Sequence, residues 1–319
     1  MGGAAGPDID RLLEGDRLAI ARAITAVENE AEGATALLGS IFARTGRAYR
    51  VGITGPPGAG KSTITSKLAH WYRRQGWRVG IIAVDPTSPF TGGALLGDRV
   101  RMTDVDLDEG VFIRSMASRG SLGGLSKKAA DAADILDAAG SDVVLLETVG
   151  VGQSELDIAG AADTTVVVLV PESGDSIQAM KAGLMEIADF FVLNKSDRAG
   201  ADQAVMSIQM ILNFRRANGW KPCVLKSVAS EGSGIGEIAG VIDAHRAYLE
   251  RSGALVRRRS ARLGRRIREL IADRLRVDFW TPEREALLSA KVGEVMDYRS
   301  TPYDAAMALV ADFRGRDGA

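Results

Sequence analysis

A glycine-rich segment at residues 55–62, G-P-P-G-A-G-K-S, places the strongest constraint on how this chain can fold. It follows an apolar run at 51–54 and opens an amphipathic stretch at 61–75, the strand–loop–helix context of a phosphate-binding loop. The glycines allow backbone N–H groups to turn toward phosphate oxygens, and the helix N-terminus adds positive potential. An ordinary glycine-rich turn is the competing interpretation, but such a turn does not require the Lys-Ser pair. The predicted phosphate-binding residues are Gly55, Pro57, Gly58, Ala59, Gly60, Lys61, Ser62 and Thr63.

Apolar runs alternate with amphipathic stretches through the middle of the chain. The runs lie at 51–54, 79–84, 143–147, 165–170, 190–194 and 223–227, and helical patterns lie at 61–75, 126–139, 176–187 and 202–217. The runs are nearly continuous rather than alternating, as expected for strands covered on both faces. The pattern predicts an α/β fold with a doubly wound, mainly parallel sheet.

Helical patterns without strands flank this region on both sides. Residues 8–45 carry apolar side chains at helical spacing, and strand signals stop near Tyr248. Amphipathic helices follow, one of them capped by Thr281 before Pro282. The predicted organisation is a helical extension at 1–45, a phosphate-loop nucleotide-binding domain at 46–250 and a helical arm at 251–319.

Composition narrows the class of protein. The 319 residues are 46% hydrophobic and 25% charged, with a net charge of −1, which is typical of a globular protein and gives no general attraction to nucleic acid or anionic lipid. The single cysteine, Cys223, excludes an internal disulfide framework and suits a reducing compartment. We find no apolar run of about 18 residues and no signal peptide. The expected location is cytoplasmic, without a membrane or nucleic-acid partner. The basic run at 257–266 could bind nucleic acid, but we favour the solvated face of a helix.

A second motif, N-K-x-D, ends the apolar run at 190–194 and predicts a guanine site. The Asp197 carboxylate can accept hydrogen bonds from N1–H and the amino group of guanine, whereas adenine has no such donor pair. Asn194 can reach the other guanine edge, and the Lys195 stem can lie across the ring. The backbone of Ser227, Val228 and Ala229 could donate to the base, or it could form an ordinary turn. Together with the phosphate loop, where Lys61 would bridge the β and γ phosphates and Ser62 would bind Mg²⁺, the motif predicts GTP.

Three acidic residues are candidates for the metal region. Asp85 directly follows the run at 79–84, at the strand end where ligands gather in parallel sheets, although it could be a turn residue before Pro86. Asp98 lies in a glycine-punctuated segment that could move, or could be a solvated loop. Glu147 occupies the place where many phosphate-loop GTPases carry the Asp of D-x-x-G, and the next Gln, Gln153, lies three residues beyond Gly150.

These motifs, taken in order, resemble the MeaB/ArgK family of GTPases, which are associated with adenosylcobalamin-dependent acyl-CoA mutases. The matching segments are GPPGAGKST, AVDPTSP, GGALLGDRVRM, SRGSLGGLS, ETVGVGQSE and NKSD, within about residues 20–249. The resemblance implies that Ser62 binds Mg²⁺ directly and that Asp85, Asp98 and Glu147 surround the ion and its waters. Residues 171–181 match an additional switch that senses the mutase, in which Lys181 would move toward the phosphates. The implied catalytic residues are Lys61, Asp85, Glu147 and Lys181, and the implied switch residues are Gly97, Asp98, Arg99, Gly150, Gln153, Asp175 and Lys181.

The resemblance also implies a function. It predicts a Mg²⁺-dependent GTPase that acts as a G-protein chaperone, gates cofactor loading, protects a mutase and does not itself bind cobalamin. Intrinsic hydrolysis should be slow, because no water-positioning Gln stands beside Gly150, although Gln153 remains a candidate. The C-terminal helices would form a homodimer, and an adenosyltransferase is a further candidate partner.

Departures from the family pattern at Thr87, Phe90 and Glu172-Ser173 leave the mutase open. Methylmalonyl-, ethylmalonyl-, isobutyryl- and 2-hydroxyisobutyryl-CoA mutases all remain candidates. Two other functions compete. A kinase linked to basic amino-acid transport is disfavoured by N-K-x-D, and a nickel-insertion GTPase is disfavoured by the scarcity of His and Cys.

Overall fold

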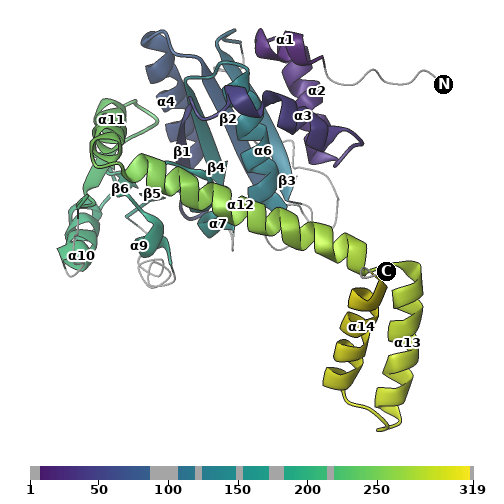
Figure 1. Cartoon of the computed structure of the whole chain (residues 1–319). Coiled ribbons are helices and arrows are strands. Elements are labelled where there is room, and N and C mark those ends of the chain that lie inside the picture. Colours follow the sequence, from purple (N-terminus) through teal and green to yellow (C-terminus); the bar gives the residue numbers. More distant parts are fainter. Residues whose placement is uncertain are drawn as a thin grey trace. The chain divides into compact units, whose positions relative to one another are not determined.

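Parallel strands form the centre of the computed structural model, which describes residues 8–86, 107–118, 124–148, 154–171, 183–213 and 219–316 (Figure 1). The described strands form one seven-stranded sheet in the order β3-β2-β4-β1-β5-β6-β7. Every pairing within it is parallel, which confirms the predicted fold class. The strands are β1 Tyr49–Thr54, β2 Val79–Pro86, β3 Val111–Ser118, β4 Val143–Thr148, β5 Thr164–Leu169, β6 Phe190–Asn194 and β7 Val224–Ser227.

Helices cover both faces of this sheet, which explains why its strands are apolar on both sides. Alternate strand residues point to opposite faces. Val166 and Val168 of β5 pack in the same core as α4 (Lys61–Arg74) and α11 (Ile235–Arg251). Val167 and Leu169 pack on the opposite face with α10 (Ala201–Asn213). The remaining helices between strands are α6 Gly124–Ala138, α7 Ser154–Ala161 and α9 Leu184–Ile187.

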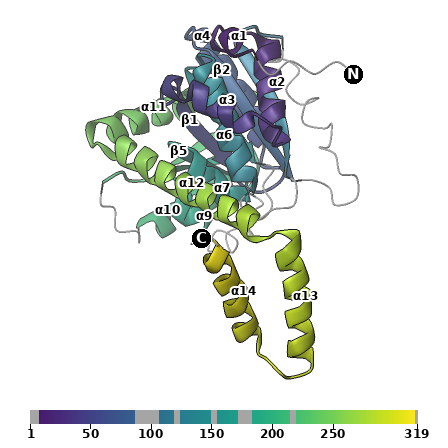
Figure 2. The ribbon, with the colours of Figure 1, turned by 45° about the vertical axis from the view of Figure 1, so that its right-hand side comes forward.

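The N-terminal helices belong to the core of the same unit. They are α1 (Ile9–Leu13), α2 (Arg17–Glu28) and α3 (Ala34–Ile41), followed by a 3₁₀ turn at Phe42–Arg44. Leu12, Ile24 and Ile41 are fully buried in a cluster shared with α6 and α7, and Figure 2 shows α2 and α3 beside α6. Helices of this length are marginal alone, so packing on α6 is what stabilises them.

A second compact unit comprises Ser260–Ala319, after a first unit that comprises Met1–Arg259. The second unit contains the later part of α12 (Ala254–Phe279), α13 (Pro282–Met296) and α14 (Pro302–Arg316). Thr281 caps α13 by accepting a hydrogen bond from the Arg284 backbone, as predicted. The Arg284 guanidinium is buried between the rings of Phe279 and Phe313, 5.4 and 4.8 Å from their centroids. None of the helices in the described part of the chain is both long and apolar enough to span a membrane.

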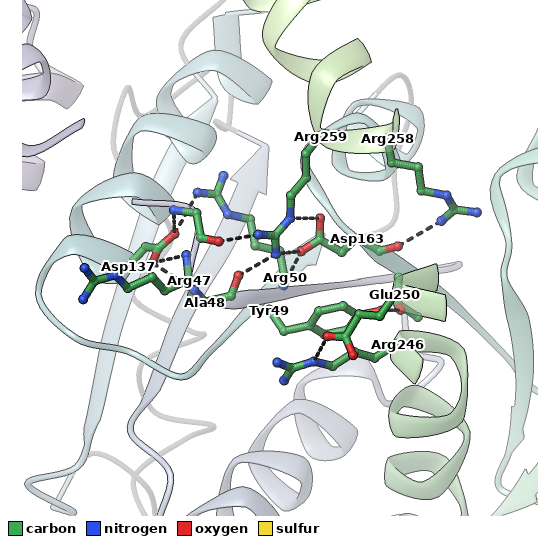
Figure 3. A network of polar contacts seen from close by, with 12 residues as sticks. Arg47, Ala48, Tyr49, Arg50, Asp137, Asp163, Arg246, Glu250, Arg258 and Arg259 are labelled. Carbon is green, nitrogen blue, oxygen red and sulfur yellow. Dashed lines mark hydrogen bonds and ion pairs between the residues drawn. The ribbon is translucent and has the colours of Figure 1, made fainter. Parts of the chain in front are cut away.

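Two aspartates are bound by consecutive arginines at the amino edge of the sheet. Figure 3 shows one of these pairs, Arg259 with Asp163. Asp163 precedes β5 and accepts from the Arg50 backbone and from Arg259, the latter at 2.6 Å. Asp189 precedes β6 and accepts from the Thr165 backbone and from Arg258 at 2.8 Å. The solvated-face interpretation of the basic run is therefore wrong for Arg259, whereas Arg258 pairs with Asp189 while its side chain stays 42% exposed. Sequence periodicity misses these pairs because their partners lie 69 and 96 residues away.

Replacing Arg259 with Met is expected to lower the free energy of unfolding by about 3 kcal/mol or more, because it removes the bidentate partner of a fully buried carboxylate. Urea unfolding of the purified protein measures the effect. Arg11→Met is the control, since Arg11 pairs with Asp16 in solvent and such pairs contribute little. Equal effects of the two variants would contradict the importance of the buried pair.

His245 predicts a pH dependence of stability. Its side chain is fully buried, with Nδ1 2.8 Å from Thr164 Oγ1 and Nε2 3.4 Å from Asp189 Oδ1. Burial lowers its pKa to about 4, although Asp189 and Asp163 oppose the shift and Arg258 adds to it. In the unfolded chain His245 binds a proton near pH 6.5, whereas in the folded protein it binds one only near pH 4. The free energy of unfolding therefore falls as the pH drops from 6.5 to about 4.

Between pH 7.5 and pH 5 the expected loss from His245 is about 2 kcal/mol, from proton linkage alone. Urea unfolding at the two pH values measures the total change, to which other groups also contribute. The variant His245→Asn does not titrate in this range, and its pH dependence should be smaller than that of the unaltered protein by this amount. The same pH dependence in both proteins would contradict the assignment to His245.

Candidate functional site

The phosphate-loop segment joins the carboxyl end of β1 to the first residue of α4. Gly60, the residue before the helix, has a left-handed φ of +88°. A hydrogen bond of 3.3 Å from the Ala59 backbone to the Pro56 carbonyl closes a turn inside the loop. The N-terminus of a 14-residue helix therefore opens directly from the loop, and the N–H groups of its first turn suit an anion. Pro57, Gly58 and Thr63 lie exposed around this opening.

Lys61 is held across the loop rather than extended into solvent. Its Nζ donates to the carbonyls of Gly55 and Pro56, both at 2.8 Å, and its side chain is buried. These carbonyls keep the ammonium beside the α4 N-terminus. A phosphate oxygen placed there would meet a lysine that is already in position.

Ser62 and Glu147 meet although they are 85 residues apart in the chain. The Ser62 hydroxyl donates to Glu147 Oε1 at 2.5 Å. Glu147 is buried near the end of β4, where its backbone lies opposite Ile53 of β1 and Ala83 of β2. The carboxylate therefore reaches the start of α4 from the strand next to the phosphate loop.

This pair fits a magnesium ion. A serine hydroxyl that donates its hydrogen still offers oxygen lone pairs to a cation. Mg²⁺ prefers such oxygen donors and retains several waters, which a nearby carboxylate such as that of Glu147 can accept. The residues present thus have the chemistry that a nucleotide-bound Mg²⁺ requires.

The backbone of Asp85 lies at the same edge of the sheet. Asp85 follows Val84 in β2, and Val84 pairs with Thr148, the residue after Glu147. Asp85 itself pairs with Ala117 of β3. Its place at the carboxyl ends of the strands agrees with a site there. The other predicted switch and metal residues lie outside the described residues; they are Gly97, Asp98, Arg99, Gly150, Gln153, Asp175 and Lys181.

Asn194 connects the phosphate loop to the turn after β7. Its buried amide donates from Nδ2 to the Ala59 carbonyl at 2.8 Å. Its Oδ1 accepts from the Ser227 hydroxyl at 3.1 Å and from the Ala229 backbone at 3.0 Å. These bonds brace two loops, and the contact of Asn194 with a guanine edge stays a prediction. Local spacing cannot indicate this role, because the contact with Ala59 spans 135 residues.

Lys195 adds a parallel contact. Its Nζ donates to the Gly58 carbonyl at 2.8 Å, so consecutive residues of N-K-x-D bind consecutive carbonyls of the phosphate loop. Lys195 also has a φ of +56°, a backbone conformation that residues other than glycine rarely adopt. Such backbone conformations persist where the surroundings enforce them and are frequent at functional sites. The following turn leaves Asp197 exposed to a ligand.

The predicted base-binding turn at Ser227, Val228 and Ala229 is already bonded within the protein. The Val228 backbone donates to the Ser233 carbonyl at 3.1 Å, and the Ala229 backbone donates to Asn194. The Ser227 carbonyl accepts from Ser196 of N-K-x-D at 3.1 Å. The turn therefore fixes the N-K-x-D segment, and two of the three backbone donors expected for the base are used for that purpose.

Comparisons with known proteins agree with this geometry. The family model described as methylmalonyl-CoA mutase-associated GTPase MeaB matches residues 20–284. A protein of Pyrococcus horikoshii named as a GTPase is 49% identical over 314 residues, covering 97% of this chain and 98% of that protein. The mitochondrial methylmalonic aciduria type A homolog of Mus musculus is 34% identical over 325 residues, covering 96% of this chain and 78% of the relative.

A solved structure described as LAO/AO transport system kinase is 30% identical and superposes with a TM-score of 0.74, covering 96% of each chain. The family match extends over most of the chain and includes the phosphate loop, Glu147 and N-K-x-D. The chain therefore belongs to the MeaB family of methylmalonyl-CoA mutase-associated GTPases.

Proposed function

We propose that this protein is a Mg²⁺-dependent GTPase that serves as a G-protein chaperone for an adenosylcobalamin-dependent acyl-CoA mutase. The Ser62–Glu147 contact beside the phosphate loop carries the first part of the proposal, because it joins the two groups that a nucleotide-bound Mg²⁺ needs. The family description and the mouse relative support the second part. The chaperone would gate cofactor loading and protect the mutase, without binding cobalamin itself.

The residues of the site would divide the work between phosphate and metal. Lys61 and the N-terminus of α4 would hold the β and γ phosphates. Ser62 would bind Mg²⁺ directly, while Glu147, Asp85 and Asp98 would hold its waters. When bound, Mg²⁺ neutralises charge on the transferring phosphoryl group. The Asp197 carboxylate would select guanine.

The partner would complete the catalytic arrangement. No Gln stands in the sequence directly after Gly150, so intrinsic hydrolysis is expected to be slow. Docking of the mutase would draw Lys181 toward the phosphates from the additional switch, which also contains Asp175. Other GTPases gain about 10³–10⁵ in rate when a partner supplies one cationic group.

A second copy of the chain is the proposed partner of the second unit. Its helices leave large apolar side chains exposed, whereas a monomer in water usually covers patches of this kind. Association through these side chains would form a homodimer. They include Ile267 at 56%, Ile271 at 53%, Met296 at 73% and Met307 at 74%.

The test is GTP turnover by the purified protein alone and with each of several acyl-CoA mutases that hold adenosylcobalamin. Strong stimulation by one mutase would support the chaperone function and identify the partner. The same assays with Lys61→Ala protein measure any GTPase activity that the mutase preparations contribute. Turnover that no mutase stimulates would leave a GTPase and overturn the mutase assignment.

A kinase linked to transport is the second candidate, since the solved relative is described as an LAO/AO transport system kinase. A kinase that uses ATP would turn over ATP at least as well as GTP. Preference for GTP, and no phosphate transfer from ATP to protein, would reject this candidate.

A further inference from the structure

Two buried threonines lie directly behind the candidate metal site. Thr54 is the last residue of β1 and precedes Gly55, and Thr148 is the last residue of β4 and follows Glu147. Both side chains are fully buried, and the Thr148 hydroxyl donates to Thr54 Oγ1 at 3.0 Å. Each threonine therefore adjoins a part of the site without contacting a ligand position.

The hydroxyl bond lies where the backbone pairing between these strands ends. The register of β1 and β4 runs from Tyr49 with Val143 to Ile53 with Glu147. Thr54 and Thr148 would be the next pair. They are paired on their outer sides instead, Thr54 with Val167 of β5 and Thr148 with Val84 of β2. The side-chain bond thus joins the two central strands at the point where the phosphate loop leaves the sheet.

The bond is also on the opposite face from the metal ligands. Side chains alternate along β4, and Leu145 packs in the α4 core while Leu146 packs on the other face. The Glu147 side chain lies on the face covered by α4, where it meets Ser62. The Thr148 side chain lies on the opposite face. A shift of the β4 end would move Glu147 and Thr148 together, so fixing one fixes the other.

We propose that the Thr54–Thr148 hydroxyl bond is a positioning contact for the magnesium site. It holds the end of β4 against the end of β1, so that the Glu147 carboxylate meets the Ser62 hydroxyl. The inference rests on the proposed Mg²⁺-dependent function. Losing the bond weakens Mg²⁺ binding, whereas the phosphate loop and N-K-x-D, which carry nucleotide binding without metal, keep their own contacts.

Thr148→Val is the test, because it replaces the hydroxyl by a methyl group of similar size. The Mg²⁺ concentration that gives half-maximal GTP turnover is expected to rise about tenfold, which corresponds to about 1.4 kcal/mol. GDP affinity measured in EDTA should change by less than about twofold, because the phosphate loop and N-K-x-D keep their own contacts in the variant. Thr54→Val should have the same effect, and the double variant should be no worse than either. Thr148→Ser keeps the hydroxyl donor and should therefore retain most of the Mg²⁺ affinity.

Thr164→Val is the matched control. Thr164 is a fully buried strand threonine at the opposite edge of the sheet, and its hydroxyl contacts Tyr49 and His245. It should lower the melting temperature without changing the Mg²⁺ requirement. A Mg²⁺ requirement raised equally by Thr164→Val, or unchanged in Thr148→Val, would overturn the positioning role. If the unaltered protein shows no Mg²⁺-dependent turnover, the proposed function itself fails, and that result is distinct from both.

Discussion

Replacing Gly60 with Ala is expected to reduce GTP affinity by at least about 100-fold, from a steric conflict and backbone strain that add to more than about 2.7 kcal/mol. A Cβ at this position would lie 2.3 Å from Asn194 Nδ2. Asn194 cannot yield easily, because its buried amide is fixed to Ala59, Ser227 and Ala229. The added methyl group would therefore push the phosphate loop away from the N-K-x-D segment.

Isothermal titration with GDP and with a non-hydrolysable GTP analogue measures this effect. Gly58→Ala is the matched control, since Gly58 also has a positive φ, +74°, but a Cβ there meets no described atom within 4 Å. It introduces backbone strain of about 1–2 kcal/mol without the conflict at Asn194. The difference in nucleotide affinity between the two variants measures the effect of the steric conflict with Asn194. Equal losses would mean that strain alone decides the affinity and that the Asn194 brace matters little.

Most strands of the sheet can be predicted from the apolar runs in the sequence, and the elements that the pattern misses have physical reasons. Six strands were predictable because both faces of the interior strands are buried and their sequences are continuous. The strand β3 was missed because it lies at the sheet edge, where Arg114 and Ser115 interrupt the apolar pattern. The eight-residue helix α7 was also missed, as its apolar and polar residues are only weakly separated.

Some features of the candidate site depend on residues that are close in sequence, and others depend on residues that are far apart. The phosphate loop and N-K-x-D are recognisable because their chemistry depends on residues that are close in sequence. Asn194, by contrast, forms hydrogen bonds with residues 59, 227 and 229. Thr148 forms one with Thr54, which is 94 residues away. Such contacts arise from the order of strands in the sheet. No pattern of residue types in a single segment predicts them.

In the proposed function, specificity for guanine rests on one side chain, that of Asp197. Asp197→Asn is expected to lower GTP affinity by about 100-fold or more, because two charge-assisted hydrogen bonds to guanine contribute about 1.5–3 kcal/mol each. Xanthosine triphosphate carries an oxygen where guanine has its amino group. Its affinity should fall much less than that of GTP, or should rise. The preference between the two nucleotides should therefore narrow or reverse.

Competition binding of GTP, xanthosine triphosphate and ATP to both proteins measures that preference. Asp202→Asn is the control, because Asp202 is an exposed acid near the same edge that pairs with Lys226 instead of a predicted ligand position. The turn that presents Asp197 is held by backbone bonds from Ser196 to Ser227 and from Arg198 to Lys195, so the substitution should not move it. An unchanged nucleotide preference in Asp197→Asn would then mean that the base binds elsewhere, since neither charge loss nor misfolding would explain the result.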